Sequence, residues 1–237
     1  MSQTKERPIL FSAPMVRAIL EGRKTVTRRE VKKKAALDCL ASGFEPAFLT
    51  LPGNSDLCPY GRPGDRLWVR ETWYCDHFEV MRGPYLKPDD LDIGEAIDDG
   101  TLVYAADGLA PYEQEQPTWK PSIHMPRWAC RILLEITDVR VERLQDISEE
   151  QAQAEGCFFT DYGQQCAHGG TGWKDIGIYP AVVGHQQRTG WAWDKTTSHE
   201  ECLGSPRWAF ANLWNATGGD WDSNPWVWVV EFKRVTP

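Results

Sequence analysis

The strongest constraint on the fold is a set of short stretches in which apolar and polar residues alternate. The clearest runs from Trp226 to Val235, and another runs from Trp128 to Arg143. A third, Arg66 to Trp73, follows the turn sequence Pro63-Gly64-Asp65. Alternation with a period of two is typical of β-strands with one buried face. Because few helical segments lie between these strands, we expect an α+β protein built on a small mixed β-barrel with a few flanking helices.

Capping and stop signals predict three short helices. The first is expected to begin at Ser12 and to end before Gly22. The second follows the capping box Ser148–Gln151 and runs from Glu149 to Glu155, where Gly156 stops it. The third is expected from Ser205 through Trp214. These helices are too few and too short to form a bundle, so the strands must supply most of the core.

Two long segments interrupt this pattern. Residues 76–118 are acidic and rich in proline and glycine, and residues 157–204 are rich in glycine, histidine and tryptophan. We interpret both as insertions in a single domain that covers residues 1–237, a length sufficient to bury a sizeable core. Residues 30–57 carry no clear periodicity, and we expect them to be irregular.

Composition limits the classes of protein that this chain can belong to. The net charge of −8 argues against a general nucleic-acid-binding protein. Met1 to Pro8 is polar and no long apolar run follows, so we expect neither a signal peptide nor a membrane span. Seven cysteines without framework spacing are typical of a reducing compartment, and we expect a cytoplasmic protein. No feature indicates an obligate protein partner.

The charge is unevenly distributed. The segment from Arg17 to Lys34 contains eight basic residues and only two acidic ones, Glu21 and Glu30. An acidic protein with one basic segment can offer a local site for an anion. For Lys32 to Lys34, a basic face exposed to solvent is an equally good interpretation.

Within the basic segment, Lys24 and Thr27 form a candidate catalytic pair. A lysine that has lost its proton can take one from a threonine hydroxyl and so activate it as a nucleophile. A bend after Gly22 would be needed to bring the two side chains together, and Thr25 is a rival nucleophile. The alternative is a turn exposed to solvent with no catalytic role.

Two carboxylates occupy unusual positions. Glu71 follows Leu67 and Val69 on the face of its strand that we expect to be buried, so it should be paired with a cation or have a raised pKa. Glu155 is the last residue of its expected helix, where the helix dipole disfavours a negative charge. A carboxylate destabilised in this way can carry a proton during catalysis, although an exposed structural glutamate is the simpler interpretation.

No motif indicates a cofactor. Glycine-rich phosphate loops, dinucleotide-binding fingerprints, zinc-protease motifs and nucleophile elbows do not occur in the sequence. Zinc could bind the group Cys166, His168, His199 and Cys202, with Cys157 and His185 nearby. The spacings are atypical and no CxxC pair occurs, so we predict no metal and no cofactor.

Three blocks taken together resemble the ASCH family. They are Gly22-Arg23-Lys24-Thr25-Val26-Thr27-Arg28-Arg29 after the first expected helix, the helix at Ile147–Glu155, and Val229–Lys233 in the closing strand. Within that family the chain is similar to the small bacterial N4-acetylcytidine amidohydrolases. The block Pro63–Trp73 resembles larger ASCH proteins of phage and prophage origin. The resemblance implies a PUA-like β-barrel with an open cleft beside the first helix.

The catalytic set of that family is a lysine, a threonine and a glutamate. On this sequence the resemblance assigns these roles to Lys24, to Thr27 as the second threonine of Lys-Thr-x-Thr, and to Glu155. It therefore favours Thr27 over Thr25. The implied reaction is hydrolysis of an acyl group from the exocyclic amine of a cytosine nucleoside, in which Lys24 activates Thr27 and Glu155 assists the leaving amine.

Substrate binding is expected from residues near these blocks: Arg23, Arg29, Glu71, Trp68 and Trp73. The arginines would shape the cleft or contact the base, and a tryptophan would stack on the pyrimidine. ASCH and PUA-like domains also bind RNA, so the alternative is an RNA- or modified-base-binding module, with or without ribonuclease activity. A zinc-stabilised interaction protein is a third hypothesis.

Overall fold

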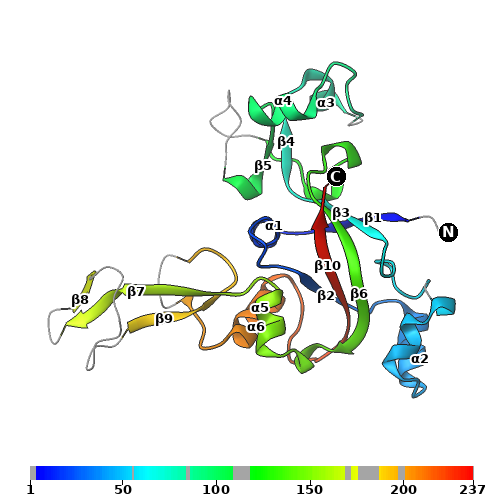
Figure 1. The fold of residues 1–237 in the computed structure, drawn as a ribbon, viewed down its shortest axis with the longest axis vertical. Coiled ribbons are helices and arrows are strands. Elements are labelled where there is room, and N and C mark those ends of the chain that lie inside the picture. The colour runs from blue at the N-terminus through cyan, green and yellow to red at the C-terminus, as the bar shows by residue number, and fades with distance from the viewer. Residues whose placement is uncertain are drawn as a thin grey trace.

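The computed structural model describes residues 4–54, 56–83, 86–108, 118–168, 172–175, 187–196 and 201–236. Its centre is a five-stranded sheet in the order β1-β3-β6-β10-β2 (Figure 1). These strands are β1 (Glu6–Leu10), β2 (Val26–Glu30), β3 (Arg66–Arg70), β6 (Leu133–Arg143) and β10 (Trp226–Val235). β1 pairs with β3 in parallel, and the other neighbouring strands are antiparallel. The expected α+β class is confirmed.

The described strands form an open sheet rather than a closed version of the small mixed β-barrel that we expected. β1 and β2 are its two edges, and no pairing between described strands joins them. A side chain spans the gap instead, since Nη2 of Arg29 on β2 donates a hydrogen bond to the carbonyl of Leu10 at the end of β1 (2.6 Å). The unpaired edge of β2 is therefore available to form the wall of a cavity.

The alternation in the closing strand is confirmed and explains why both faces of the sheet are covered. Val227 and Val229 pack into a cluster with the helices α5 and α6. Trp228 and Val230, on the other face, pack into a second cluster with α1 and the strands β1 and β3. Strand β10 thus lies between two apolar cores, as a central strand with large residues on both faces should.

The three expected helices are present as α1 (Ala13–Leu20), α5 (Glu149–Ala154) and α6 (Pro206–Ala216). The capping box is confirmed, since the Ser148 hydroxyl accepts from the Gln151 amide and the Gln151 side chain accepts from the Ser148 amide. Ser12 makes no such side-chain hydrogen bond. Gly22 has a φ of 75°, which allows the turn after α1.

Residues 30–57 are more ordered than we expected. They contain α2 (Lys34–Ala41) and the 3₁₀ helices η1 (Pro46–Thr50) and η2 (Pro52–Asn54). The expectation of an irregular segment is wrong because Ala36 and Leu49, which are fully buried, anchor these short helices to the main core. Cys39 and Leu40 pack against the same core, so α2 has a short apolar stripe at positions 36, 39 and 40 with helical spacing.

The segment 76–118 and its surroundings form a small lobe with its own core. It contains β4 (Trp73–Cys75) paired with β5 (Leu102–Tyr104), and the helices α3 (Phe78–Arg82) and α4 (Ile93–Asp98). The other 3₁₀ helices are η3 (Ala105–Asp107), η4 (Ser122–His124), η5 (Arg127–Ala129) and η6 (Leu144–Asp146). The lobe lies beyond the end of the central sheet (Figure 1).

The segment 157–204 contains strands rather than only loops. They are β7 (Phe158–His168), β8 (Gly172–Asp175) and β9 (Gln187–Ala192), which pair in the order β8-β7-β9 and extend away from the central sheet (Figure 1). The interpretation of both segments as insertions stays a prediction. Among the described residues, no helix combines the length and the apolar character needed to cross a lipid bilayer.

Gly156 is expected to be essential for the packing of α5 on α1. Its φ is 106°, and a Cβ added there would lie 2.9 Å from the Cβ of Ala18. Gly156→Ala should therefore lower the free energy of unfolding by about 1–3 kcal/mol, measured by urea denaturation. Gly53→Ala is the matched control, because no atom lies within 4 Å of the added Cβ. Equal losses in the two variants would contradict this account.

Candidate active site

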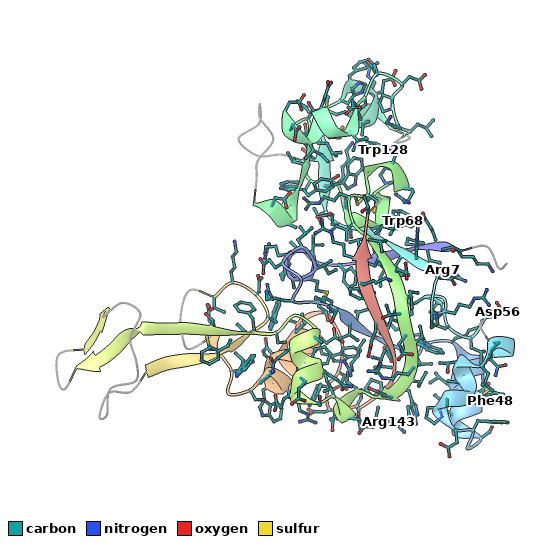
Figure 2. The ribbon with its side chains drawn as sticks, viewed as in Figure 1. Arg7, Phe48, Asp56, Trp68, Trp128 and Arg143 are labelled. Carbon is teal, nitrogen blue, oxygen red and sulfur yellow. The ribbon has the colours of Figure 1, made fainter. Side chains whose placement is uncertain are left out.

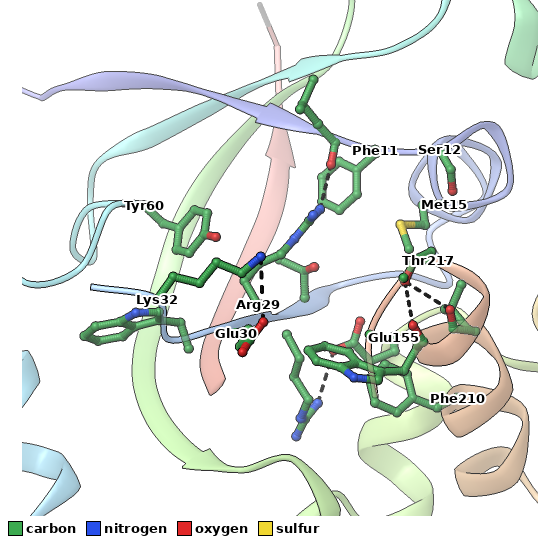
Figure 3. Close-up of a pocket in the computed structure, with 18 of the residues that line it drawn as sticks. Phe11, Ser12, Met15, Arg29, Glu30, Lys32, Tyr60, Glu155, Phe210 and Thr217 are labelled. Atoms are coloured by element: carbon green, nitrogen blue, oxygen red, sulfur yellow. Dashed lines mark hydrogen bonds and ion pairs between the residues drawn. The ribbon is translucent and has the colours of Figure 1, made fainter. Parts of the chain in front are cut away.

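A cavity of about 910 Å³ opens along the free edge of β2. Its walls come from the end of β1, from α1, from the segment around Tyr60 and from α6. In Figure 3, Arg29 and Tyr60 lie on one side of this cavity, and Phe210 of α6 and Thr217, which directly follows α6, lie on the other. The lining is mixed, with aromatic, cationic and acidic side chains: Phe11, Thr27, Arg28, Arg29, Lys32, Tyr60, Glu155, Phe210, Trp214 and Trp228 are among them.

The backbone brings Lys24 and Glu155 together from distant parts of the sequence. The two residues form an isolated antiparallel β-bridge, and the Thr25 amide donates to the Ala154 carbonyl (2.9 Å). The Lys24 amide donates to Ala18 at the end of α1 (3.0 Å). The chain turns at Gly22, and the turn brings Lys24 to the end of α5. Among the described residues no hydrogen bond joins Lys24 to Thr27, and Thr27 lines the cavity whereas Lys24 does not.

Lys24 and Glu155 form a buried ion pair. Nζ of Lys24 donates to Oε2 of Glu155 (2.6 Å) and to its backbone carbonyl (2.9 Å), although the two residues are only 2% and 3% exposed. Burial lowers the pKa of the Lys24 ammonium, and the Glu155 carboxylate opposes this shift. A lysine in such surroundings loses its proton more easily than an exposed one, which is what a general base needs.

Arg28 is a site residue that the sequence analysis missed. Its Nη1 donates to Oε1 of Glu155 (3.3 Å), and its Nη2 donates to Gln151 (2.9 Å) and to Glu142 (3.3 Å). Arg28 therefore holds one oxygen of the Glu155 carboxylate while Lys24 holds the other. Gln151 also belongs to the capping box of α5, so the start of this helix is linked to the carboxylate at its end.

Thr27 lines the cavity and Thr25 does not. Thr27 is only 2% exposed, whereas Thr25 is exposed to solvent. Within the described part of the chain, the structure records no hydrogen bond from the Thr27 hydroxyl to another side chain. Hydrogen bonds between catalytic groups are often long or absent before substrate binds, so this geometry leaves Thr27 able to act.

The two predicted arginines differ in position. Arg29 lines the cavity and lies over the ring of Phe11, with 5.1 Å between its Cζ atom and the ring centroid. Arg23 does not line it, since its guanidinium lies over Phe158 and donates to the Gly156 carbonyl (2.6 Å). Arg23 thus fixes the backbone next to Glu155, and Arg29 is available to a molecule in the cavity.

Glu71, Trp68 and Trp73 lie elsewhere, and none of them lines the cavity. Trp68 and Trp128 lie between the central sheet and the small lobe (Figure 2), where Trp73 is fully buried against Trp128. Glu71 is paired with a cation, which was one of the two alternatives that its buried position predicted. Both of its oxygens accept from Arg131 at 2.9 Å, and burial raises the pKa of its carboxyl while Arg131 opposes this shift.

The zinc hypothesis finds no support in the part of the chain that the structure describes, where no group of three metal-ligating side chains occurs. The side chains of Cys166 and His168, and all of His185 and His199, lie outside the described residues. Cys157 is buried beside Glu155, and this burial raises the pKa of its thiol to about 12. Its thiolate, the form that binds metal, is therefore disfavoured.

Comparisons of the chain with protein-family models, with curated proteins and with solved structures found no match. The resemblance to the ASCH family therefore stays a hypothesis that rests on the quoted residues.

The ion pair predicts an unequal effect of removing its two partners. Glu155→Leu leaves Lys24 and Arg28 without their shared carboxylate, so it should lower the free energy of unfolding by about 3–5 kcal/mol. Lys24→Met should cost less, because Arg28 still neutralises Glu155. Urea denaturation at neutral pH measures both values. A larger loss in Lys24→Met than in Glu155→Leu would contradict the shared role of the carboxylate.

Proposed function

We propose that this protein is an amidohydrolase that removes the acyl group from N4-acetylcytidine or a related N4-acylated cytosine nucleoside. The observation that carries the proposal is the buried pair of Lys24 and Glu155, together with an open cavity that both Glu155 and Thr27 line. These are the three residues that the family resemblance assigns to catalysis. Two of them are joined in the structure by a 2.6 Å hydrogen bond, although 130 residues separate them in the chain.

In the first half of the reaction, Thr27 is the nucleophile. Lys24, in its neutral form, takes the proton from the Thr27 hydroxyl as Oγ1 attacks the acyl carbonyl carbon. The bond between that carbon and N4 of the cytosine then breaks. The amine nitrogen receives a proton from the Lys24 ammonium or through Glu155, and the acyl group remains as an ester on Thr27.

In the second half, water releases the acyl group. Glu155 or Lys24 accepts a proton from the water as it attacks the ester, and returns this proton to Oγ1 of Thr27 as the ester bond breaks. The products are the carboxylic acid and the unmodified cytosine nucleoside. Arg28 keeps the Glu155 carboxylate in place during both halves, because it holds Oε1 while Lys24 holds Oε2. The reaction as written needs no metal.

The cavity offers the surfaces that a nucleoside requires. Its volume of about 910 Å³ lies within the range of about 300–1,000 Å³ found for small-molecule sites. Phe11, Tyr60, Phe210 and Trp228 provide aromatic side chains for a planar base. These residues replace Trp68 and Trp73 as candidates for stacking.

The RNA-binding alternative rests on one observation, the basic residues Arg29, Lys32 and Lys33 at the cavity. Binding without hydrolysis would weaken steeply as salt rises, because it depends on contacts with phosphates. Turnover of a neutral nucleoside has no such dependence. The hydrolysis assay therefore decides between the two functions.

Purified protein is expected to release cytidine from N4-acetylcytidine, measured by ultraviolet absorbance. Thr27→Ala, Lys24→Met and Glu155→Gln should each lower kcat/KM by at least about 1,000-fold, because each removes a group that acts in the transition state. Thr25→Ala is the matched control, because Thr25 does not line the cavity, and it should keep its activity. Full activity in Thr27→Ala would rule out the mechanism, and no turnover by the folded parent would favour the binding module.

The reaction should depend on pH in a way that reflects Lys24. Only the neutral amine can accept a proton, so kcat/KM should rise with pH. Because burial lowers the pKa of Lys24 from 10.5, the midpoint of the rise should lie below this value. A pH–rate profile measures the midpoint, and circular dichroism at each pH tests whether the protein stays folded. A midpoint at or above 10.5 would contradict the role of Lys24 as the base.

A further inference from the structure

The cavity carries more positive charge than a neutral nucleoside can use. Arg28, Arg29, Lys32 and Lys33 line it, against the two carboxylates Glu30 and Glu155. Glu155 is already paired with Arg28 and with Lys24 behind it. The remaining three cations therefore face a single exposed carboxylate, in a protein whose net charge is −8. A positive site on an acidic protein indicates a ligand with negative charge.

The three remaining cations, Arg29, Lys32 and Lys33, have N–H groups that can still bind a ligand. Among the described residues, the Arg29 guanidinium has one hydrogen-bond acceptor, the Leu10 carbonyl, and its buried Nε has none. Lys32 is 81% exposed at its side chain, and its Nζ lies 3.7 Å from the nearest carboxylate oxygen, on Glu30. Lys33 donates to a backbone carbonyl, that of Asp56 (2.5 Å), and not to a carboxylate. Among the described residues, none of the three forms an ion pair with a buried carboxylate.

The cations and the catalytic carboxylate lie on different sides of the cavity. In Figure 3, Arg29, Lys32 and Tyr60 lie on one side, while Glu155 and Phe210 lie on the other. An N4-acylated cytidine matches this arrangement, since its acyl group and its ribose hydroxyls lie at opposite ends of the molecule. With the acyl group at Thr27 and Glu155, the ribose end would reach the three cations.

We infer that the substrate is an N4-acylated cytidine that carries a phosphate ester on its ribose, and that Arg29, Lys32 and Lys33 bind this phosphate. The inference rests on the proposed amidohydrolase function and deepens it. A guanidinium with free N–H groups and two ammonium groups are the donors that phosphate oxygens prefer. The same chemistry fits a free nucleotide and a nucleotide within a single strand, where the aromatic lining could stack further bases.

The test compares three substrates: N4-acetylcytidine, its 5′-monophosphate, and a short single-stranded oligonucleotide with one N4-acetylcytosine. At low salt, kcat/KM for at least one phosphorylated substrate should exceed that for the nucleoside by about tenfold or more, mainly through KM. The advantage should shrink as salt rises, because ions screen exposed charges. The monophosphate and the oligonucleotide distinguish a free nucleotide from a polymer as the source of the phosphate.

Substitutions of the lysines test where the phosphate of the substrate binds. In the double variant Lys32→Ala/Lys33→Ala, the ratio of kcat/KM for the phosphorylated substrate to that for the nucleoside should fall towards one. Lys34→Ala is the matched control, since Lys34 pairs with Asp38 and does not line the cavity. This variant should keep the ratio of the parent. Equal kcat/KM for all three substrates would overturn the inference while the proposed function stands.

A binding measurement separates this inference from the proposed function. Cytidine 5′-monophosphate and cytidine carry no acyl group, so calorimetry can compare their affinities whether or not the protein hydrolyses amides. Tighter, salt-sensitive binding of the monophosphate, lost in the double lysine variant, would support the phosphate site even if no acylated substrate were cleaved. Equal affinities for the two ligands would overturn it.

Discussion

The arrangement of the site depends on one buried carboxylate that two cations share. Glu155 places one oxygen on Lys24 and the other on Arg28, and all three side chains are almost completely removed from water. Transfer of such charges into the interior is unfavourable unless each of them is paired. The three groups are therefore stable only as a set, and the set joins the turn after α1, the edge strand β2 and the end of α5. Gly156 allows this approach because a side chain there would collide with Ala18.

The open sheet follows from the same arrangement. Lys24 pairs with Glu155 by a β-bridge on one side of β2, and Phe232 of β10 donates its amide to Thr25 on the other. Beyond this point β2 continues as an edge, because β1 ends at Leu10 and the chain turns into α1. The cavity lies along this free edge, where Thr27 of β2 and Glu155 both line it.

Sequence patterns predicted the parts of the fold in which a local rule and the tertiary structure agree. Alternation predicted β10 and the greater part of β3 and β6, and the capping box predicted α5, because one face of each element is buried. The expected strands were too long, since β3 ends at Arg70 and β6 begins at Leu133. The helix α2 was missed although Ala36, Cys39 and Leu40 have helical spacing, because this apolar stripe spans little more than one turn. Arg28 was missed because its acceptors, Glu142 and Gln151, lie in other elements, and no local sequence pattern predicts a contact between distant segments. Trp73 was assigned to ligand binding, but a large aromatic residue also fills a core, which is where it lies.

The cations of the segment 17–34 divide into two groups with different chemistry. Lys24 and Arg28 point into the protein, and their charges are satisfied by Glu155 and Glu142. They cannot leave these partners for a ligand without leaving a buried carboxylate unpaired, so they fix the position of Glu155. Arg29, Lys32 and Lys33 lie further along the same stretch and line the cavity. Arg28 and Arg29 are neighbours on β2 and both line the cavity, but Arg28 donates to Glu155 whereas Arg29 donates to the Leu10 carbonyl. Under the proposed function, one short basic stretch therefore holds the Glu155 carboxylate and also offers cations to an anionic ligand.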